Sequence, residues 1–199
     1  HHILLGLRWH YDEEDRFQHF DTYNFISGQM ALTNAGSPGS ESNRIESAHA
    51  SSGFIQYTLK WDRLKLVPGL RYEHITIGRA DYGKTDPDRM GVNLKERNNT
   101  VGVFIPGIGF HWDAAANLDL YGGIHKGFSP PGSSPGAKQE ESINYELGFS
   151  TTGGVWETNV AFFVNDFSNL LGNDLMATGG LGDGNMFNAG EVLSRGVET

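Results

Sequence analysis

Apolar and polar residues alternate with a period of two through most of the chain, in runs rich in Val, Ile, Leu and aromatic residues. Such alternation is typical of β-strands that have one apolar and one polar face. Eight strands are predicted, over residues 2–11, 47–61, 64–79, 97–113, 117–128, 141–152, 154–168 and 189–199. The pattern therefore indicates an all-β protein.

The links between these strands alternate strictly between short and long. The short ones are Asp62-Arg63, Ala114-Ala115-Ala116 and Gly153-Gly154, and the long polar ones cover 12–46, 80–96, 129–140 and 169–188. An antiparallel up-and-down meander has this asymmetry when one rim carries turns and the other carries loops, as outer-membrane barrels do. A sandwich with Greek-key crossings does not require this alternation of short and long links.

The positions of the aromatic residues are those expected in a barrel wall. Trp61, Trp112 and Trp156 each lie beside a short turn on the apolar face, and Trp9, Tyr11 and Tyr72 lie toward the loops. Indole favours the boundary between membrane and water, so the two sets predict two aromatic girdles. The alternative is that they are core aromatics of a soluble sandwich. The strand prolines, Pro68 and Pro106, count against a closed sheet because each removes a ladder donor.

The amino-acid composition excludes several classes of protein. The 199 residues include 27 Gly and no Cys, and the formal net charge is −9. The glycine content argues against a helical protein, the acidic balance argues against a nucleic-acid binder, and the lack of cysteine excludes disulfides and thiolate zinc sites. No apolar run approaches the roughly 18 residues of a membrane helix, but a barrel strand alternates and needs none.

Several segments carry a family resemblance. They are GLRWHYDEEDRFQ (6–18), PGLRYEHI (68–75), FIPGIGFHW (104–112), LYGGIHKGFSPP (120–131), ESINYELGFS (141–150) and RGVE (195–198). Together they resemble the barrel of TonB-dependent outer-membrane receptors, and their order is similar to that of the ferric-citrate (iron dicitrate) receptor group. The resemblance implies a 22-stranded transmembrane barrel in the outer membrane of a Gram-negative bacterium, an N-terminal plug domain and a TonB box.

The resemblance also sets the expected domain organisation. Both ends of the chain fall within predicted strands, so residues 1–199 are expected to form one partial barrel domain, without the plug domain and the TonB box. Active transport then needs the TonB complex acting through that missing plug. The open alternatives are a self-contained eight-stranded barrel that serves as adhesin or anchor, and a soluble carbohydrate-binding sandwich.

The predicted cargo is a ferric chelate, either ferric citrate or a ferric siderophore, which offers anionic oxygens to cationic side chains. By strand parity Arg8, His10 and Arg71 point away from lipid near the loop rim, and they are the first candidates for substrate binding. His125, followed by Lys126, leads into the GFSPP loop and is the fourth candidate. The alternative is that this motif only fixes the exit of the loop, since Pro130-Pro131 imposes an extended backbone. The alternative is that Arg8 and Arg71 pair with carboxylates such as Glu73.

Other chemistry is not expected. The acidic run Asp12–Asp15 and the trio Asp81, Asp86 and Asp88 lack calcium-loop spacing and are expected to be solvated loop charge. The glycine-rich segment 179–185 is one copy of a pattern that binds calcium only in repeats. No GxSxG, HExxH or P-loop motif is present, so neither enzyme activity, a metal site nor a cofactor is predicted.

Overall fold

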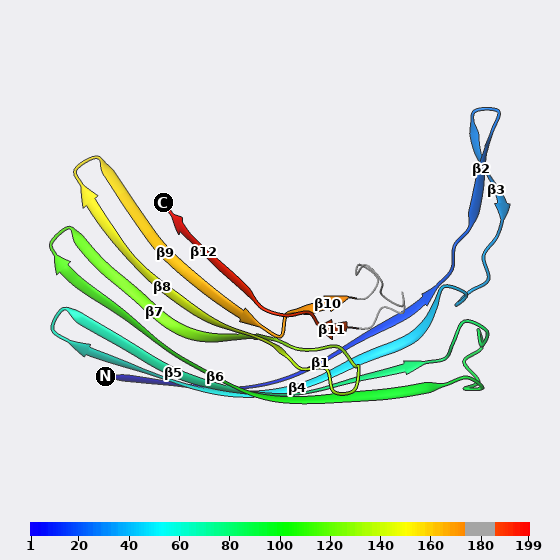
Figure 1. Ribbon diagram of the computed structural model, residues 1–199, viewed down its shortest axis with the longest axis horizontal. Helices are drawn as coiled ribbons and strands as arrows, with labels where there is room; N and C mark the ends of the chain where they lie inside the picture. The colour runs from blue at the N-terminus through cyan, green and yellow to red at the C-terminus, as the bar shows by residue number, and fades with distance from the viewer. Residues whose placement is uncertain (174–185) are drawn as a thin grey trace.

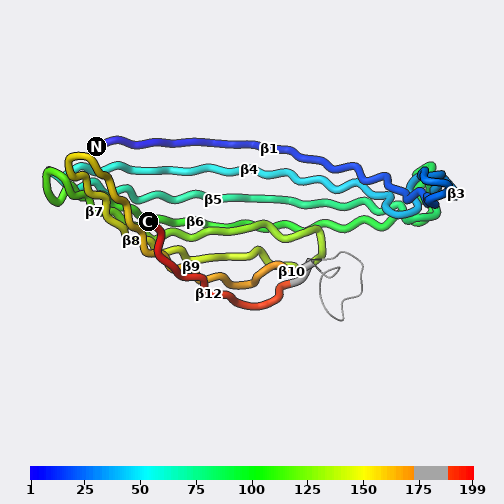
Figure 2. The backbone as a smooth tube through the Cα atoms, turned by 90° about the horizontal axis from the view of Figure 1, so that it is seen from above, coloured from blue at the N-terminus to red at the C-terminus, as the bar shows by residue number. Residues whose placement is uncertain are grey.

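The computed structural model describes residues 1–173 and 186–199. Eight strands form one antiparallel sheet in the order β1-β4-β5-β6-β7-β8-β9-β12, and two short hairpins, β2–β3 and β10–β11, lie in its long connections. The sheet is a single curved layer with one concave side (Figure 1). Strands β1, β4, β5 and β6 run side by side along its length, and β7, β8, β9 and β12 are shorter (Figure 2). The predicted all-β meander is confirmed.

The strand bounds extend most predictions by a few residues. They are β1 (His2–Gln18), β2 (Thr22–Ile26), β3 (Gln29–Asn34), β4 (Ser42–Trp61), β5 (Leu64–Asp81), β6 (Lys95–Ala115), β7 (Leu118–Ser129), β8 (Glu140–Gly153), β9 (Trp156–Ser168), β10 (Leu171–Asn173), β11 (Met186–Asn188) and β12 (Val192–Glu198). The links at one end, 62–63, 116–117 and 154–155, each have two residues. This end is the turn end of the sheet, and the opposite one is the loop end.

The prediction that residues 12–46 form one long loop is wrong. Strand β1 continues to Gln18, paired with β4 down to Ser42, and the hairpin of β2 and β3 follows. Alternation is lost there because residues 12–16 are charged on both faces. The backbone ladder with β4 and the ion pair of Asp15 with Arg89 hold this part of β1, so the hydrophobic pattern does not show it.

One face of the sheet is an apolar belt. Its members include Ile3, Leu5, Leu7, Trp9, Ile55, Trp61, Leu70, Tyr72, Phe104, Ile108, Trp112, Leu147, Trp156 and Phe162, and all are exposed. The register places both predicted aromatic sets on this face. The belt segments 64–72 and 104–112 match the roughly 9–11 residues that a tilted strand needs to cross a bilayer.

The rest of the molecule does not bury this belt. Leu7 is 93% exposed and Trp61 is 82% exposed, and the buried apolar side chains among the described residues are Ile75, Val101 and Val103. A sandwich would pack its Trp-bearing face against a second sheet. The described strands instead leave the belt open, as a lipid-facing wall requires. Among the described residues, no helix is long and apolar enough to span a membrane.

The two prolines interrupt the ladder locally. The pairing of β4 with β5 skips the positions opposite Pro68, and the ladder between β6 and β7 begins only after Pro106, at Gly107. Each proline still has a partner on the other side, because Pro68 lies opposite Ile108 and Pro106 lies opposite Leu70. A missing N–H on one side of a strand is therefore accommodated within the sheet.

The loop between β5 and β6 is clamped onto the loop end by Arg89. Its Nη1 and Nη2 donate to Asp15 at 2.9 and 2.5 Å, and its Nε donates to Asn43 at 2.8 Å. The guanidinium also lies over the rings of Phe17 and Tyr82. These contacts fix the loop on the apolar-face side of β1 and β4, beyond the belt.

The face assignment predicts a difference between two arginine substitutions. Ile108→Arg puts a charge in the middle of the belt, which costs about 2–4 kcal/mol at a bilayer midplane. Val67→Arg puts the same charge on the opposite face and is expected to cost much less. Denaturant-dependent folding of the receptor that contains this chain, into phospholipid vesicles, measures both. Equal losses for the two variants would contradict the assignment.

The Arg89 clamp is expected to open in acid. The hydrogen bonds from Arg89 lower the pKa of Asp15, so the pairing stabilises the docked loop above the ordinary aspartate pKa. This stabilisation is lost as the pH falls through the lowered pKa. The protection of the amides in residues 86–91, relative to the intrinsic exchange rate at each pH, should fall below about pH 4 in the parent chain. In Asp15→Asn, exchange should already be fast at neutral pH, whereas identical pH profiles would exclude the clamp.

Candidate functional site

The concave, polar face of the sheet holds all four predicted binding residues. Register links Arg8 to Ser52 and His10 to Ala50, and it aligns His125 with Gly107 and Gly69. Arg71 is on the same face, opposite Phe54. The structure therefore brings the four residues onto one surface, although they come from three separate strands.

Arg71 has partners within the sheet. It pairs with Glu73, two residues along the same strand, and its Nη2 donates to the Ser52 hydroxyl at 3.1 Å. Glu73 is buried, whereas Arg8, His10 and His125 are exposed. The alternative that Arg71 pairs with Glu73 is confirmed. The pair holds the guanidinium in a fixed orientation and still leaves part of it exposed.

A hollow of about 530 Å³ lies between Arg71 and His125. Gly69, Gly107 and Gly123 form its floor, because the missing side chains leave the backbone of three neighbouring strands bare. A Cβ added at Gly107 would lie 3.0 Å from the Cβ of His125. Glycine at this position is what gives the imidazole its room.

Lys126 is not part of this face. It points to the opposite side of β7, and its Nζ lies 2.7 Å from a carboxylate oxygen of Glu141. Lys126 therefore does not stand beside the His125 imidazole, because neighbours on a strand point to opposite faces. The loop after β7 folds instead onto the polar face of β6, where the Asn99 amide donates to the carbonyls of Gly132 and Ala137.

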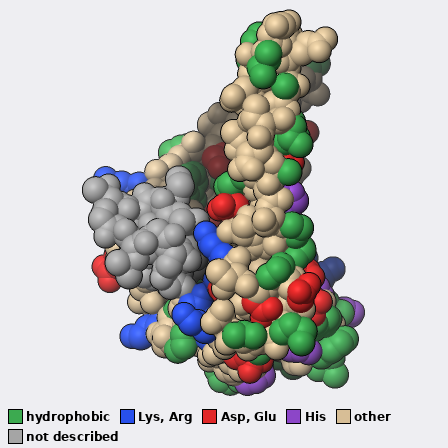
Figure 3. All heavy atoms as spheres, turned by 90° about the vertical axis from the view of Figure 1, so that its right-hand side faces the viewer, with side chains coloured by type: hydrophobic (Ala, Val, Ile, Leu, Met, Phe, Trp, Pro, Cys, Tyr) green, Lys and Arg blue, Asp and Glu red, His purple; other side chains and the backbone are tan. Residues whose placement is uncertain are grey.

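Toward the loop end, the polar face carries eight charged residues in two registered rows, here called the charged lattice. One row is Arg16, Arg44, Asp81 and Lys95, and the other is Glu14, Glu46, Arg79 and Arg97. The lattice thus holds five cations against three carboxylates. Acidic and basic side chains gather at this end of the molecule, below the projecting β2–β3 hairpin (Figure 3).

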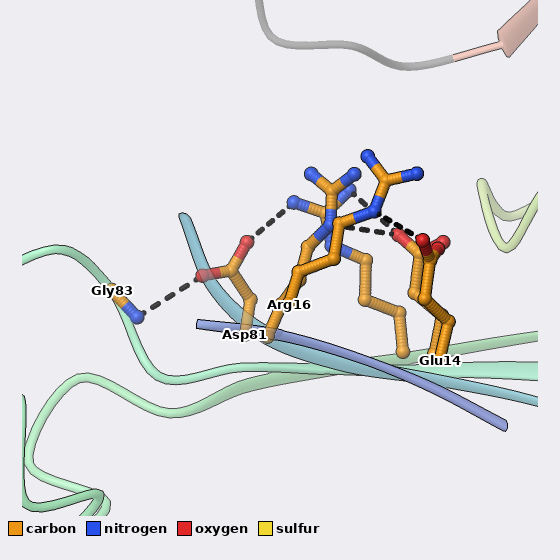
Figure 4. Close-up of polar contacts among 7 residues, drawn as sticks. Glu14, Arg16, Asp81 and Gly83 are labelled. Atoms are coloured by element: carbon orange, nitrogen blue, oxygen red, sulfur yellow. Dashed lines mark hydrogen bonds and ion pairs between the residues drawn. The ribbon is translucent and has the colours of Figure 1, made fainter. Parts of the chain in front are cut away.

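Arg79 joins the two rows of the lattice. Its Nη2 donates to Asp81 at 2.5 Å and its Nη1 lies 3.5 Å from Glu46, and its side chain is 9% exposed. Glu46 in turn lies 3.1 Å from the Nε of Arg44, and Glu14 lies 2.8 Å from the Nε of Arg16. Figure 4 shows these side chains standing together above the sheet.

The electrostatics of the lattice follow from this crowding. Burial alone raises the pKa of Asp81, but hydrogen bonds from Arg79 and from the Gly83 N–H more than offset it, so the pKa lies below its ordinary value. Burial, together with the charges of Arg79 and Arg16, lowers the pKa of Arg44. The eight residues of the lattice carry a formal surplus of positive charge, and such a surplus attracts anions.

Most of the acidic residues considered as calcium ligands interact with other groups of the protein. Glu14 pairs with Arg16, Asp15 with Arg89 and Asp81 with Arg79, and the Asp86 carboxylate accepts the backbone N–H groups of Met90 and Gly91. The prediction of solvated loop charge is wrong for Asp12–Asp15, which lie in β1, for Asp81, which lies in β5, and for Asp86, which is buried. The segment 179–185 lies outside the described residues.

The sequence did not single out Arg16, Arg44 and Arg79 as site residues. They are 28 and 35 residues apart along the chain, and only the pairing of β1, β4 and β5 makes them neighbours. A usable signal was present, since each arginine has a carboxylate two residues away, in Glu14, Glu46 and Asp81. Residues i and i+2 of a strand share a face, so this spacing predicts charge pairs on one side of a sheet.

Several solved structures share the fold of this chain. The ferric-catecholate import receptor Fiu from K12 E. coli aligns with a TM-score of 0.65 and 12% identity, over 98% of this chain and 31% of that one. The alcaligin receptor FauA from Bordetella pertussis gives 0.59 and 16%, over 97% and 36%. The FrpB iron transporter from Neisseria meningitidis gives 0.58 and 17%, over 78% and 23%. The chain thus spans about a quarter to a third of these proteins.

Comparison with curated proteins finds no match. A family profile described as "TonB dependent receptor-like, beta-barrel" matches residues 1–199. This family consists of receptors and transporters in the outer membrane of Gram-negative bacteria. Because the profile covers every residue, the chain belongs to the TonB-dependent receptor β-barrel family.

Proposed function

We propose that this chain forms part of the wall of an outer-membrane receptor that takes up a ferric chelate, with ferric citrate as the first candidate and a ferric siderophore as the next. The observation that carries the proposal is the group of four cations in the charged lattice, Arg16, Arg44, Arg79 and Lys95, which stand against three carboxylates. The lattice lies on the same polar face as Arg8, His10, Arg71 and His125. Fiu and FauA, whose fold the chain shares, are by their names receptors for a ferric catecholate and for alcaligin.

The polar face suits such a cargo in two ways. Guanidinium groups bind carboxylate and similar oxygens through paired hydrogen bonds, and Arg71 is already held in place by Glu73. The lattice lies farther toward the loops and gathers anions before they reach Arg71 and Arg8. We propose that the lattice attracts the chelate. Direct contact with the chelate is then made by Arg8, His10, Arg71 and His125.

The sheet itself supports a larger barrel. Within the described residues, β1 pairs only with β4 and β12 pairs only with β9, so the two edges are not joined to each other. A self-contained eight-stranded barrel would need that join, because an unpaired edge in hydrocarbon is very costly. We therefore propose that residues 1–199 are one partial domain of a 22-stranded wall. We also propose the TonB complex, acting on a plug domain, as the source of energy.

Arginine substitutions on the polar face test the cargo. Arg8→Gln and Arg71→Gln are each expected to weaken binding of ferric citrate by about ten- to a hundredfold, since a hydrogen bond to a charged group contributes about 1.5–3 kcal/mol. Binding is measured with radioactive iron on outer-membrane vesicles that contain the receptor. Lys126→Gln, on the opposite face, is the matched control and should bind like the parent.

Two results would contradict the proposal. One is unchanged ferric citrate binding in both arginine variants, and the other is an equal loss in Lys126→Gln. A parallel titration with a ferric catecholate siderophore separates the two cargo classes. The class whose binding responds to Arg8→Gln and Arg71→Gln is the cargo.

Asp81→Asn separates the stability of the lattice from its attraction for anions. The substitution leaves Arg79 without its closest carboxylate, and we expect a loss of about 1–3 kcal/mol in the free energy of unfolding at neutral pH. It also adds one unit of positive charge, so association with the anionic chelate should become faster at low salt and less so at high salt. Stopped-flow measurements at two ionic strengths check this result. An association rate that falls at low salt would exclude the attracting role.

A further inference from the structure

A second group of ligating side chains lies at the turn end of the polar face, far along the strands from the charged lattice. His111 and Asp113 are two residues apart on β6 and share a face, and Asp119 lies directly opposite Asp113 on β7. His111 Nδ1 is 3.2 Å from Asp113 Oδ1, and His111 Nε2 is 4.0 Å from Asp119 Oδ1. One donor atom from each of the three residues falls within 4.8 Å of the other two.

Within the described part of the chain, the two carboxylates have no arginine or lysine partner, unlike Glu73, Glu46 and Asp81 on the same face. Like charges directly opposite on neighbouring strands destabilise a sheet. Glu73, Glu46 and Asp81 each pair with an arginine, but the ionic contacts of Asp113 and Asp119 within the described residues are those with His111. Lys65 is opposite His111 on β5, and Tyr121 is opposite it on β7. A divalent cation held between the two carboxylates would remove their repulsion.

The donor set indicates which cation fits. One imidazole nitrogen and two carboxylate oxygens suit first-row transition metals, whereas calcium and magnesium prefer oxygen donors alone. Three protein donors also leave coordination positions for water. All three side chains are about half exposed, so an ion can enter from the aqueous side of the wall.

We propose that His111, Asp113 and Asp119 bind a divalent transition metal ion, Zn²⁺ in the first instance, across the β6–β7 hairpin. This site is separate from the chelate surface, because it uses none of the residues assigned there and lies at the other end of the strands. It therefore does not depend on the proposed cargo. The bound ion would join the two strands next to the turn at 116–117, where the ladder has a register shift after Asp113.

Zinc titration tests the site directly. The full chain in detergent micelles is stripped of metal with a chelator and titrated with Zn²⁺ by calorimetry. We expect one ion per chain, and affinity at least about tenfold weaker in both His111→Gln and Asp119→Asn. Asp62→Asn, in the neighbouring two-residue turn, is the matched control and should bind like the parent. Asparagine tolerates the positive φ of 52° at that position.

The proposal is overturned if both site variants bind Zn²⁺ like the parent, or if Asp62→Asn loses as much affinity as they do. It is also overturned if Ca²⁺ binds as tightly as Zn²⁺, since that result would indicate attraction by carboxylates alone. Circular dichroism of each variant checks that the variant is folded, so that a loss of Zn²⁺ binding is not caused by unfolding.

Thermal unfolding provides a second test, because Zn²⁺ should reverse the order of the unfolding midpoints of the parent and Asp119→Asn. Without metal, Asp119→Asn should unfold at a higher temperature than the parent, because the cross-strand repulsion is gone. With saturating Zn²⁺ the order should invert, since an ion that binds only the folded state stabilises the parent by mass action. A parent midpoint that does not respond to Zn²⁺ would overturn the proposal.

Discussion

The register of one continuous hydrogen-bonded ladder determines nearly everything else in this structure. Side chains on a strand alternate between two faces, so a slip of one residue between neighbouring strands would exchange the two faces of the slipped strand. The eight-stranded sheet keeps its register from β1 to β12, with one shift at the bulge after Asp113 and with ladder positions left unpaired beside Pro68 and Pro106. The apolar belt, the hollow, the charged lattice and the His111 group all depend on that alignment.

The polar face changes in character along the strands. At the turn end, His111 lies with two aspartates that have no arginine partner. In the middle, glycines remove side chains and leave a hollow beside Arg71 and His125. At the loop end, arginines outnumber carboxylates and the side chains are crowded enough to bury Arg79. One face therefore offers three chemically different surfaces, each at its own height in the wall.

The loop end shows how strands remain ordered beyond the apolar belt. There both faces of β1, β4 and β5 are polar, and hydrophobic burial cannot hold the strands in place. The backbone ladder, the ion pair of Arg79 with Glu46 on one face and the Arg89 clamp on the other take over that role. The loop-end contacts are ionic and should weaken with salt and acid, whereas the ladder within the belt should not.

The sequence by itself determined the fold class, the strand parity and the family resemblance, because the period-two pattern and the turn-forming links are local properties of the chain. It identified both aromatic girdles and placed Arg8, His10, Arg71 and His125 on one face. It missed the loop-end part of β1 and the β2–β3 hairpin, where polar residues on both faces hide the period. Only the tertiary structure decided which charges meet. Arg16, Arg44 and Arg79 are distant in sequence, and so are the hollow's glycines, and cross-strand pairing alone makes them neighbours.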